Sequence, residues 1–212
     1  TNNRQGTSPG KVFDHSGKLC WSPDGQQIVC SYGEVDQEED NKPKPEKPVW
    51  KVQTWRFSIN GSDRTRLPVP DTDFVEDWSP DGQWFVTSSD RHPPYGSGYQ
   101  LYLMRTDGTE QRRLTTEGLN VHARFSPDST RIIYTYQRRG YTNLRMVNID
   151  GTFQKEFTSD PNIGPDACWS PDGKRLAMVV HDWPVGPDGR QTLSDSSDGD
   201  YRVEVIDADG QN

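Results

Sequence analysis

Short runs of aliphatic, aromatic and β-branched residues alternate along this chain with polar segments rich in Pro, Asp and Gly. Runs of this kind, bounded by turn residues, predict β-strands; the clearest occupy residues 28–32, 84–87, 131–136 and 176–180. No segment combines a sustained helical period with the capping residues that begin and end a helix. The pattern of apolar and polar positions therefore predicts an all-β chain.

A turn motif comes just before each of these runs. Ser-Pro-Asp occupies residues 22–24, 79–81, 126–128 and 170–172, follows Trp or Phe each time, and precedes Gly in every copy but the third, which has Ser129. Successive copies are 57, 47 and 44 residues apart. Pro sets φ at the first central position of a turn, Asp caps the local backbone and Gly tolerates positive φ. Each copy therefore predicts a tight turn between two strands.

A second turn signal follows each run. Asn-Gly or Asp-Gly occurs at residues 60–61, 107–108, 150–151 and 209–210. These dipeptides favour the type I′ hairpin turn, in which both central residues have positive φ, so we expect type I′ turns here. Further strands are predicted before these turns at residues 53–59, 99–106, 143–149 and 201–208, and closing strands after the first three at residues 64–67, 111–115 and 154–158.

Each unit thus contains four short antiparallel strands joined by two kinds of tight turn. Four-stranded units that repeat at this length predict the blades of a β-propeller. A β-sandwich with the same number of strands would not explain why one turn motif returns once per unit. We therefore expect residues 1–212 to form a single propeller region with about four blades' worth of strands.

Trp-Ser-Pro-Asp-Gly followed by a β-rich run, an Asp-Gly-Thr hairpin and an Arg-Leu-Thr-like strand resembles the TolB-type propeller repeat. That repeat also occurs in the propeller domains of prolyl-oligopeptidase-like peptidases. The resemblance covers essentially the whole chain outside the inserted loops. It implies a non-catalytic scaffold that binds a protein partner or a neighbouring subunit, in the periplasm or outside the cell. A fold does not by itself fix an activity.

The resemblance also bears on the number of blades, because propellers of this family usually have six or more. It favours a chain that is a segment of a longer propeller, with open blade edges that association or further chain would cover. The alternative is an unusual four-bladed closure, in which residues 1–5 supply the fourth strand that the last unit lacks.

Charge and composition exclude several classes of partner. The formal net charge is −8, whereas nucleic acids and anionic membranes are bound by basic faces. The longest apolar run, residues 176–180, is far shorter than the ~20 residues of a membrane helix. The sequence contains neither a Walker A loop nor an HExxH motif, and we expect no cofactor.

Candidate binding residues follow from the order of strands in a blade. The two kinds of tight turn fall on one edge of the blades, which we call the turn edge. The connections between second and third strands fall on the opposite edge, the loop edge, and they vary at residues 33–49, 90–98, 137–141 and 181–200. Variable loops on a rigid scaffold commonly carry binding. The candidates for partner binding are Tyr32, Glu34, Asp90, His92, Tyr95, Arg138, Tyr141, His181, Asp182 and Trp183.

Catalytic chemistry has weaker support. His92 and His181 stand near carboxylates in two of these connections, an arrangement that suits a divalent metal or acid–base work in a lyase or hydrolase. Residues 6–10 match GxSxG but lack the strand and helix that a nucleophile elbow needs. Cys20 and Cys168 each precede a Trp, so we interpret them as small residues beside a core aromatic. Disulfide formation by the three cysteines stays open, because their odd number cannot be fully paired within the chain.

Three functions remain at this point. The first is the partner-binding scaffold. The second is the propeller module of a prolyl-oligopeptidase-like peptidase whose catalytic domain is not in this chain. The third is a metal-dependent lyase or hydrolase that uses His92 and His181.

Overall fold

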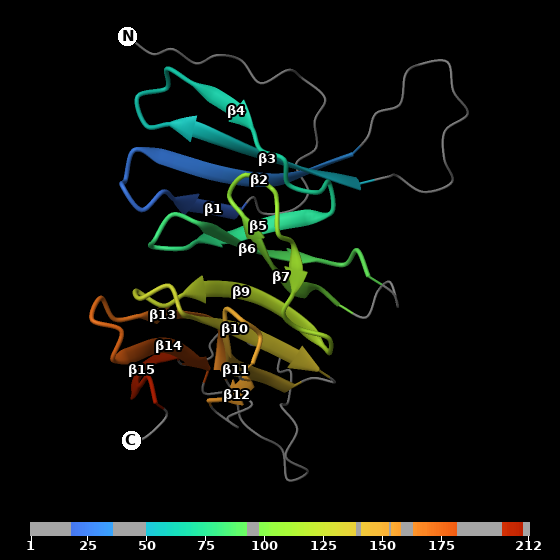
Figure 1. The fold of residues 1–212 in the computed structure, drawn as a ribbon. Helices are drawn as coiled ribbons and strands as arrows, with labels where there is room; N and C mark the ends of the chain where they lie inside the picture. The colour runs from blue at the N-terminus through green and yellow to red at the C-terminus, as the bar shows by residue number, and fades with distance from the viewer. Residues whose placement is uncertain are drawn as a thin grey trace.

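A computed structural model of the chain forms an all-β arrangement of four antiparallel sheets (Figure 1). Each sheet corresponds to one predicted blade, so the propeller architecture is confirmed. Within the part of the chain that the structure describes, no helix is long and apolar enough to cross a membrane. The described residues are 18–35, 50–92, 98–138, 141–152, 154–157, 163–181 and 201–209.

Strands follow the chain in simple up-and-down order within each sheet. The first sheet contains β1 (Lys18–Trp21), β2 (Gln27–Val35), β3 (Trp50–Ser58) and β4 (Arg64–Arg66). The second contains β5 (Asp73–Trp78), β6 (Trp84–Ser89), β7 (Gln100–Arg105) and β8 (Arg112–Arg113). The third contains β9 (Leu119–Phe125), β10 (Arg131–Arg138), β11 (Tyr141–Asn148) and β12 (Gln154–Glu156). The described part of the fourth contains β13 (Ile163–Trp169), β14 (Arg175–His181) and β15 (Tyr201–Asp207).

The strands run further into the loop edge than the sequence predicts. β2 and β3 remain paired out to Val35 and Trp50, so the first connection begins after residue 35 rather than at residue 33. β10 and β11 pair up to Arg138 and Tyr141, so residues 137, 138 and 141 of the predicted insert belong to strands. The proposed closing strand at residues 1–5 and the GxSxG match at residues 6–10 lie outside the described residues.

The Ser-Pro-Asp turns are built by the same hydrogen bonds in each sheet. Ser22 Oγ donates to Asp24 Oδ1 at 2.6 Å and accepts from the Gln27 amide at 2.8 Å. Asp24 Oδ1 also accepts from the Gln26 amide at 3.0 Å. The hydrogen bond from Ser22 is the main reason that the pKa of Asp24 lies below its usual value. The predicted capping role of Asp is therefore confirmed.

The Asn-Gly and Asp-Gly turns correct one prediction. Gly61, Gly108 and Gly151 have positive φ, but the Asn or Asp before each does not, so these are not type I′ turns. The Gly108 amide instead donates to the Arg105 carbonyl at 2.8 Å, and Gly is the fourth residue of the turn. This is the three-residue hairpin loop in which a type I turn precedes a left-handed residue. Asp107 Oδ1 accepts from both the amide and the hydroxyl of Thr109, which supports this alternative.

Hydrophobic cores lie between successive sheets. The first and second sheets enclose a cluster that includes Cys20, Val29, Val75, Phe85 and Met104. The second and third enclose Val86, Leu101, Leu103, Phe125 and Ile132, among others. The third and fourth enclose Ile133, Leu144, Met146, Leu176 and Met178, among others. Both sides of the second and third sheets are therefore buried, as expected for stacked blades.

The four sheets form an open arc in the described part of the chain. The first strands β1, β5, β9 and β13 contact one another in succession, whereas the outer strands β4, β8 and β12 do not touch each other. The first strands therefore line the inner side of the arc. No strand of the first sheet contacts a strand of the fourth among the described residues. In Figure 1 these two sheets lie at opposite ends of the molecule.

The interpretation of Cys20 and Cys168 as small residues beside a core aromatic is correct only in part, since Trp169 packs against the core between the third and fourth sheets. Cys20 is buried beside the partly buried Trp78, and burial raises the pKa of its thiol to about 12. Trp21, however, is 58% exposed, and Cys168 is exposed as well. The aromatic residue before Ser-Pro-Asp packs against the preceding sheet, and in the described part of the chain no sheet precedes the first. Cys20, Cys30 and Cys168 are all free thiols.

Candidate functional site

The loop edge of the second sheet is fixed by a buried ion pair. Arg91 Nη1 lies 3.0 Å from Asp73 Oδ2, and the side chains are 17% and 1% exposed. Thr87 Oγ1 donates to the same carboxylate oxygen at 3.0 Å. The Arg91 guanidinium also lies 3.8 Å from the centre of the Tyr102 ring. The start of the β6–β7 connection is therefore held to the sheet by charge, a hydrogen bond and an aromatic contact.

His92 belongs to the same assembly. Its ring stacks on Tyr102 with 5.5 Å between centroids, and Nδ1 lies 2.5 Å from the Tyr102 hydroxyl. One ring nitrogen is thus occupied by a contact within the sheet, which gives His92 a structural role at this edge. Asp90 beside it is exposed.

The other predicted site residues are distributed around the loop edge. Arg138 is exposed at the end of β10 and pairs with Glu117, with 2.8 Å between Nη1 and Oε2. Tyr32 is half-buried in β2. The backbones of Glu34, Tyr141 and His181 lie at loop-edge strand ends, but their side chains are outside the described structure, as are the whole residues Tyr95, Asp182 and Trp183.

Convergence of His92 and His181 stays a prediction, because only one of the two side chains is described. Among the described residues, no group of three or more His, Cys, Asp or Glu side chains is placed to hold a metal ion.

The inner strands carry a charge cluster that the sequence did not predict. Lys18 Nζ lies 3.2 Å from Glu76 Oε2 across the first and second sheets. His122 Nδ1 lies 3.2 Å from Asp166 Oδ1 across the third and fourth sheets. Between these pairs, Arg124 Nη1 donates to the carbonyl oxygen of Glu76 at 2.8 Å. These five residues, which we call the axial cluster, connect all four sheets along the inner side of the arc.

β-bulges lie at or beside the axial residues of the second, third and fourth sheets. The pairing of β5 with β6 shifts register at Glu76, and that of β9 with β10 shifts at His122 and Ala123. β13 has a similar shift just before Ala167. A bulge inserts an extra residue and re-aims the neighbouring side chains. His122 also has φ of +55°, an uncommon conformation for a residue with a Cβ atom.

Burial is the main reason that the pKa of His122 lies below its usual value, and the nearby Lys18 lowers it further. Asp166 and Glu76 act in the opposite direction but do not outweigh these effects. His122 is therefore neutral at pH 7, so its contact with Asp166 is not a full ion pair at that pH.

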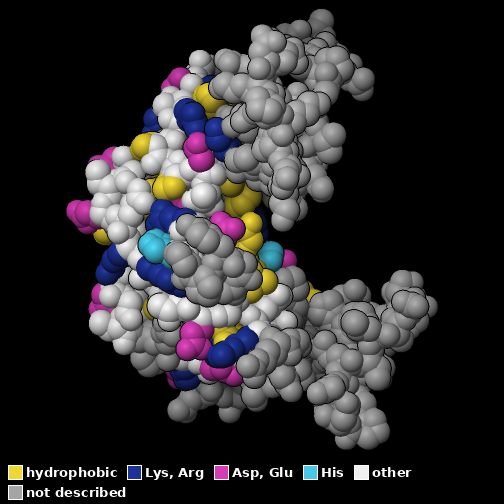
Figure 2. Space-filling model, turned by 90° about the vertical axis from the view of Figure 1, so that its right-hand side faces the viewer, with side chains coloured by type: hydrophobic (Ala, Val, Ile, Leu, Met, Phe, Trp, Pro, Cys, Tyr) yellow, Lys and Arg dark blue, Asp and Glu magenta, His cyan; other side chains and the backbone are white. Residues whose placement is uncertain are grey.

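A signal for this cluster was present in the sequence. Lys18, His122 and Asp166 each stand four residues before the Ser of a Ser-Pro-Asp turn, so the repeat places them at equivalent positions. Among the described residues on the face shown in Figure 2, side chains of both charges are interspersed.

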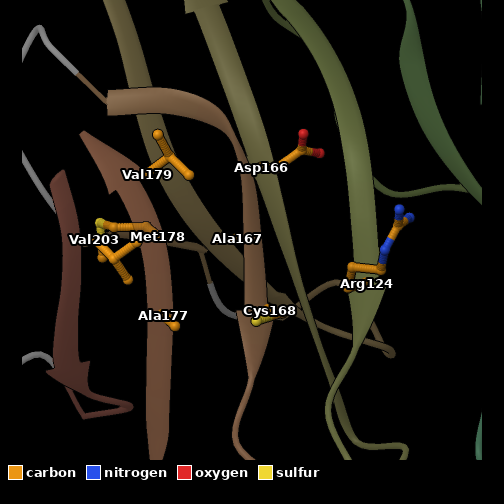
Figure 3. Close-up of a pocket in the computed structure, with 8 residues that line it drawn as sticks. All are labelled: Arg124, Asp166, Ala167, Cys168, Ala177, Met178, Val179 and Val203. Atoms are coloured by element: carbon orange, nitrogen blue, oxygen red, sulfur yellow. The ribbon is translucent and has the colours of Figure 1, made fainter. Parts of the chain in front are cut away.

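A hollow of about 360 Å³ lies next to the axial cluster, at the fourth sheet. Arg124 and Asp166 lie on one side of it, and Figure 3 shows them on neighbouring strands. Apolar residues and a thiol complete the lining: Ala167, Cys168, Ala177, Met178, Val179 and Val203.

Comparisons with known proteins agree with this architecture. The uncharacterized peptidase YuxL of Bacillus subtilis is 28% identical over 205 residues, which covers 76% of this chain and 29% of that protein. The Tol-Pal system protein TolB of Anaeromyxobacter dehalogenans is 34% identical over 93 residues, which covers 43% of this chain and 20% of that protein. This chain therefore spans less than a third of either relative.

Solved structures show the same fold. The crystal structure of TolB from Acinetobacter baumannii matches with a TM-score of 0.60 and 19% identity, over 91% of this chain and 41% of that one. A family model, the TolB beta propeller domain, matches residues 69–183, which is more than half of the chain. The chain belongs to the TolB beta propeller domain family.

Proposed function

We propose that this chain is a non-catalytic β-propeller module that binds a protein partner through its loop edge. The observation that carries the proposal is the Arg91–Asp73 pair, which holds the start of the β6–β7 connection on the sheet through a buried carboxylate. Burying a charge is costly unless it is paired. A pair of this kind therefore fixes the point at which the connection leaves the sheet, and loops that leave a rigid scaffold commonly carry binding.

Among the described residues of this edge, exposed side chains carry both charges, as with Asp90 and the Arg138–Glu117 pair. Such groups suit the polar rim of a protein interface, where they set specificity and association rate. The match to the TolB-type repeat supports a location in the periplasm or outside the cell.

Selection of peptides from a random library tests the proposal. Peptides enriched on the wild-type chain are measured against a loop-edge variant, Asp90→Lys with Arg138→Glu. A turn-edge variant, Asp63→Lys with Lys174→Glu, makes the same charge changes on the opposite edge and serves as the control. We expect about tenfold weaker binding, equal to ~1.4 kcal/mol, for the loop-edge variant alone. Failure to enrich peptides, or loss of binding only in the turn-edge variant, would contradict the proposal.

A peptidase propeller module is the second candidate, and the similarity to YuxL favours it. The reading frame that encodes this chain separates the two. A GxSxG motif downstream of Asn212, between a predicted strand and helix and followed by Asp and His, would establish the peptidase architecture. The proposal that the chain acts as a scaffold without a catalytic domain would then be wrong, whatever the peptide selection shows.

A further inference from the structure

The first Asn-Gly or Asp-Gly turn differs from the other three in one functional group. Asn60 occupies the position that Asp107, Asp150 and Asp209 hold in the later turns, so a side-chain amide replaces a carboxylate. Asn is a thermally labile residue, and it is most labile before Gly, because a residue without a Cβ atom lets its backbone nitrogen approach the amide carbon. Residue 61 is Gly, and nothing beyond its chain neighbours lies within 4 Å of the place where its Cβ atom would be.

The Asn60 side chain is open to solvent, and so is Gly61. The equivalent residues Asp107 and Asp150 are exposed as well, although the first sheet packs against the second and the second against the third. Exposure at this turn position is therefore a property of the repeat and does not depend on what precedes the first sheet. Water reaches the Asn60 amide in either case.

Fewer hydrogen bonds hold this turn than hold the later ones. Among the described residues, Asn60 Oδ1 accepts one hydrogen bond, from the Ser62 amide at 2.9 Å. Asp107 Oδ1 accepts two, from the amide of Thr109 at 2.9 Å and from its hydroxyl at 2.6 Å, and the turn of the third sheet has the same two bonds. The side chain at residue 60 therefore restrains its turn less than the aspartates restrain theirs.

The backbone of the turn has to open before the amide reacts. The Gly61 amide donates to the Ser58 carbonyl at 2.8 Å, which keeps its nitrogen away from the Asn60 side chain. The following strand, β4, has three residues, and all of them are exposed. Little packing therefore holds the turn closed, and segments of this kind open locally while the rest of a domain stays folded.

We propose that Asn60 is a site of spontaneous deamidation. The Gly61 nitrogen loses its proton and bonds to Asn60 Cγ, and the side-chain nitrogen leaves with a proton as ammonia, which closes a succinimide ring. Water then adds to one of the two ring carbonyls and breaks its bond to the Gly61 nitrogen. Addition at Cγ gives aspartate, and addition at the backbone carbonyl gives isoaspartate. The sum consumes one water and releases one ammonia, so no enzyme, oxidant or reductant is needed.

The two products have opposite effects on the turn. Aspartate is the residue of the other three turns, and its carboxylate accepts from both the amide and the hydroxyl of Ser62 as Asp107 does from Thr109. Isoaspartate routes the chain through the side-chain carbon, and the extra backbone atom breaks the turn between β3 and β4. Either product adds one negative charge to the turn edge. This inference does not depend on what binds the loop edge.

Peptide mapping of the purified chain by mass spectrometry tests the site. During incubation at pH 8, residue 60 should become one dalton heavier through an intermediate that is lighter than Asn by one ammonia. Conversion should be slower at pH 6, because attack requires loss of the proton from the nitrogen. Asn148 also stands at a strand end but precedes Ile149, whose branched side chain hinders the nitrogen, so it should stay unchanged and is the internal control. No change at residue 60 in the folded chain while the chain unfolded in urea deamidates, or equal conversion at residues 60 and 148, would overturn the proposal.

Two variants test the chemistry and the role of the turn. Gly61→Ala places a methyl group beside the attacking nitrogen and should slow the reaction severalfold in both the folded and the urea-unfolded chain. Ser62→Thr reproduces the Thr109 hydroxyl bond of the second sheet, which should lower the open population, and with it the rate in the folded chain alone, about fivefold, or ~1 kcal/mol. An unchanged rate in the Ala variant would contradict attack by the Gly61 nitrogen. An equal effect of the Thr variant in the folded and unfolded chains would contradict reaction through the opened turn.

Hydrogen exchange separates the two products. Asp-N protease cleaves before aspartate but not before isoaspartate, so it identifies each form after the two are separated by ion exchange. The isoaspartyl form should lose amide protection in β4, whereas the Asn60→Asp variant should keep it. Equal protection in both would contradict the effect assigned to the extra backbone atom.

Discussion

Ser129 offers a direct test of how the turns connect neighbouring sheets. It occupies the position that is Gly in the other Ser-Pro-Asp turns and has φ of +60°, a conformation that costs a residue with a Cβ atom about 1–2 kcal/mol. Its hydroxyl accepts a hydrogen bond from the Asp81 amide in the second sheet at 3.0 Å, and the residue is buried at 6% exposure. One residue thus combines a local strain with a contact between sheets.

Two substitutions separate these effects. Ser129→Ala keeps the backbone strain and removes the hydrogen bond, so we expect it to lower the free energy of unfolding by about 1 kcal/mol. Ser129→Gly also removes the hydrogen bond but relieves the strain, since Gly adopts positive φ freely. The two terms nearly cancel in the Gly variant, whose stability should lie within about 0.5–1 kcal/mol of wild type.

Urea unfolding followed by Trp fluorescence measures the order of stability. The Ala variant should unfold at the lowest urea concentration, with an unchanged m-value. In thermal unfolding, a loss of about 1 kcal/mol corresponds to a shift of roughly 2–4 °C for a chain of this size. If the Ala variant proved as stable as the Gly variant, the strain at Ser129 would not have the assigned cost. If the Ala variant matched wild type, the hydrogen bond to the second sheet would contribute nothing.

Three further comparisons test the packing and electrostatics. Gly118→Ala adds a Cβ atom that overlaps the Tyr136 ring and should lower the free energy of unfolding by about 3 kcal/mol. Gly25→Ala has a similar φ but lies in open space, so it should lower that free energy by only about 1–2 kcal/mol. Equal losses of stability in urea unfolding would contradict the role of the overlap. Arg91→Ala leaves a buried carboxylate unpaired and should cost about 3 kcal/mol, while loss of the exposed Arg138 pair should leave unfolding nearly unchanged. Burial raises the pKa of the Asp77 carboxyl in the folded state, because it disfavours the charged form. The protonated carboxyl therefore favours the folded state at low pH, and this contribution to stability is lost as the pH rises through the folded-state pKa. Asp77→Asn should therefore gain stability relative to wild type between pH 3 and pH 7, and a constant difference would refute this assignment.

The parts of the fold that local chemistry determines were predictable from the sequence. Ser22, Asp24 and Gly25 interact within a few residues, so the motif alone specifies a tight turn with flanking strands. The type of the second turn was predicted wrongly because an Asp-Gly dipeptide suits two hairpin loops, and the hydrogen bonds from Thr109 to Asp107 favour the one with a single left-handed residue.

Contacts between different sheets could not be predicted in the same way. His122 and Asp166 lie in different sheets, and their approach depends on bulges that shift the register of β9 and β13. Arg91 follows β6, whereas its partner Asp73 begins β5, so the pair depends on the alignment of two strands. A hydrophobic pattern fixes which face of a strand is buried but does not reveal such a bulge.

The repeat also explains why the inner strands can differ in chemistry while the sheets stay alike. The Ser-Pro-Asp turn residues and the hydrophobic residues that pack against the preceding sheet are needed wherever two sheets meet. They therefore recur in all four units. The position four residues before Ser-Pro-Asp is less constrained: Val75 is buried in the core between the first and second sheets, whereas Lys18, His122 and Asp166 hold polar groups there in the other three. Substitutions of these three polar residues should therefore alter what the arc binds more readily than whether it folds. The two ends of the arc follow the same pattern. Trp21 and Val205 are hydrophobic, like the residues at the equivalent positions of the inner sheets, although no described sheet covers them.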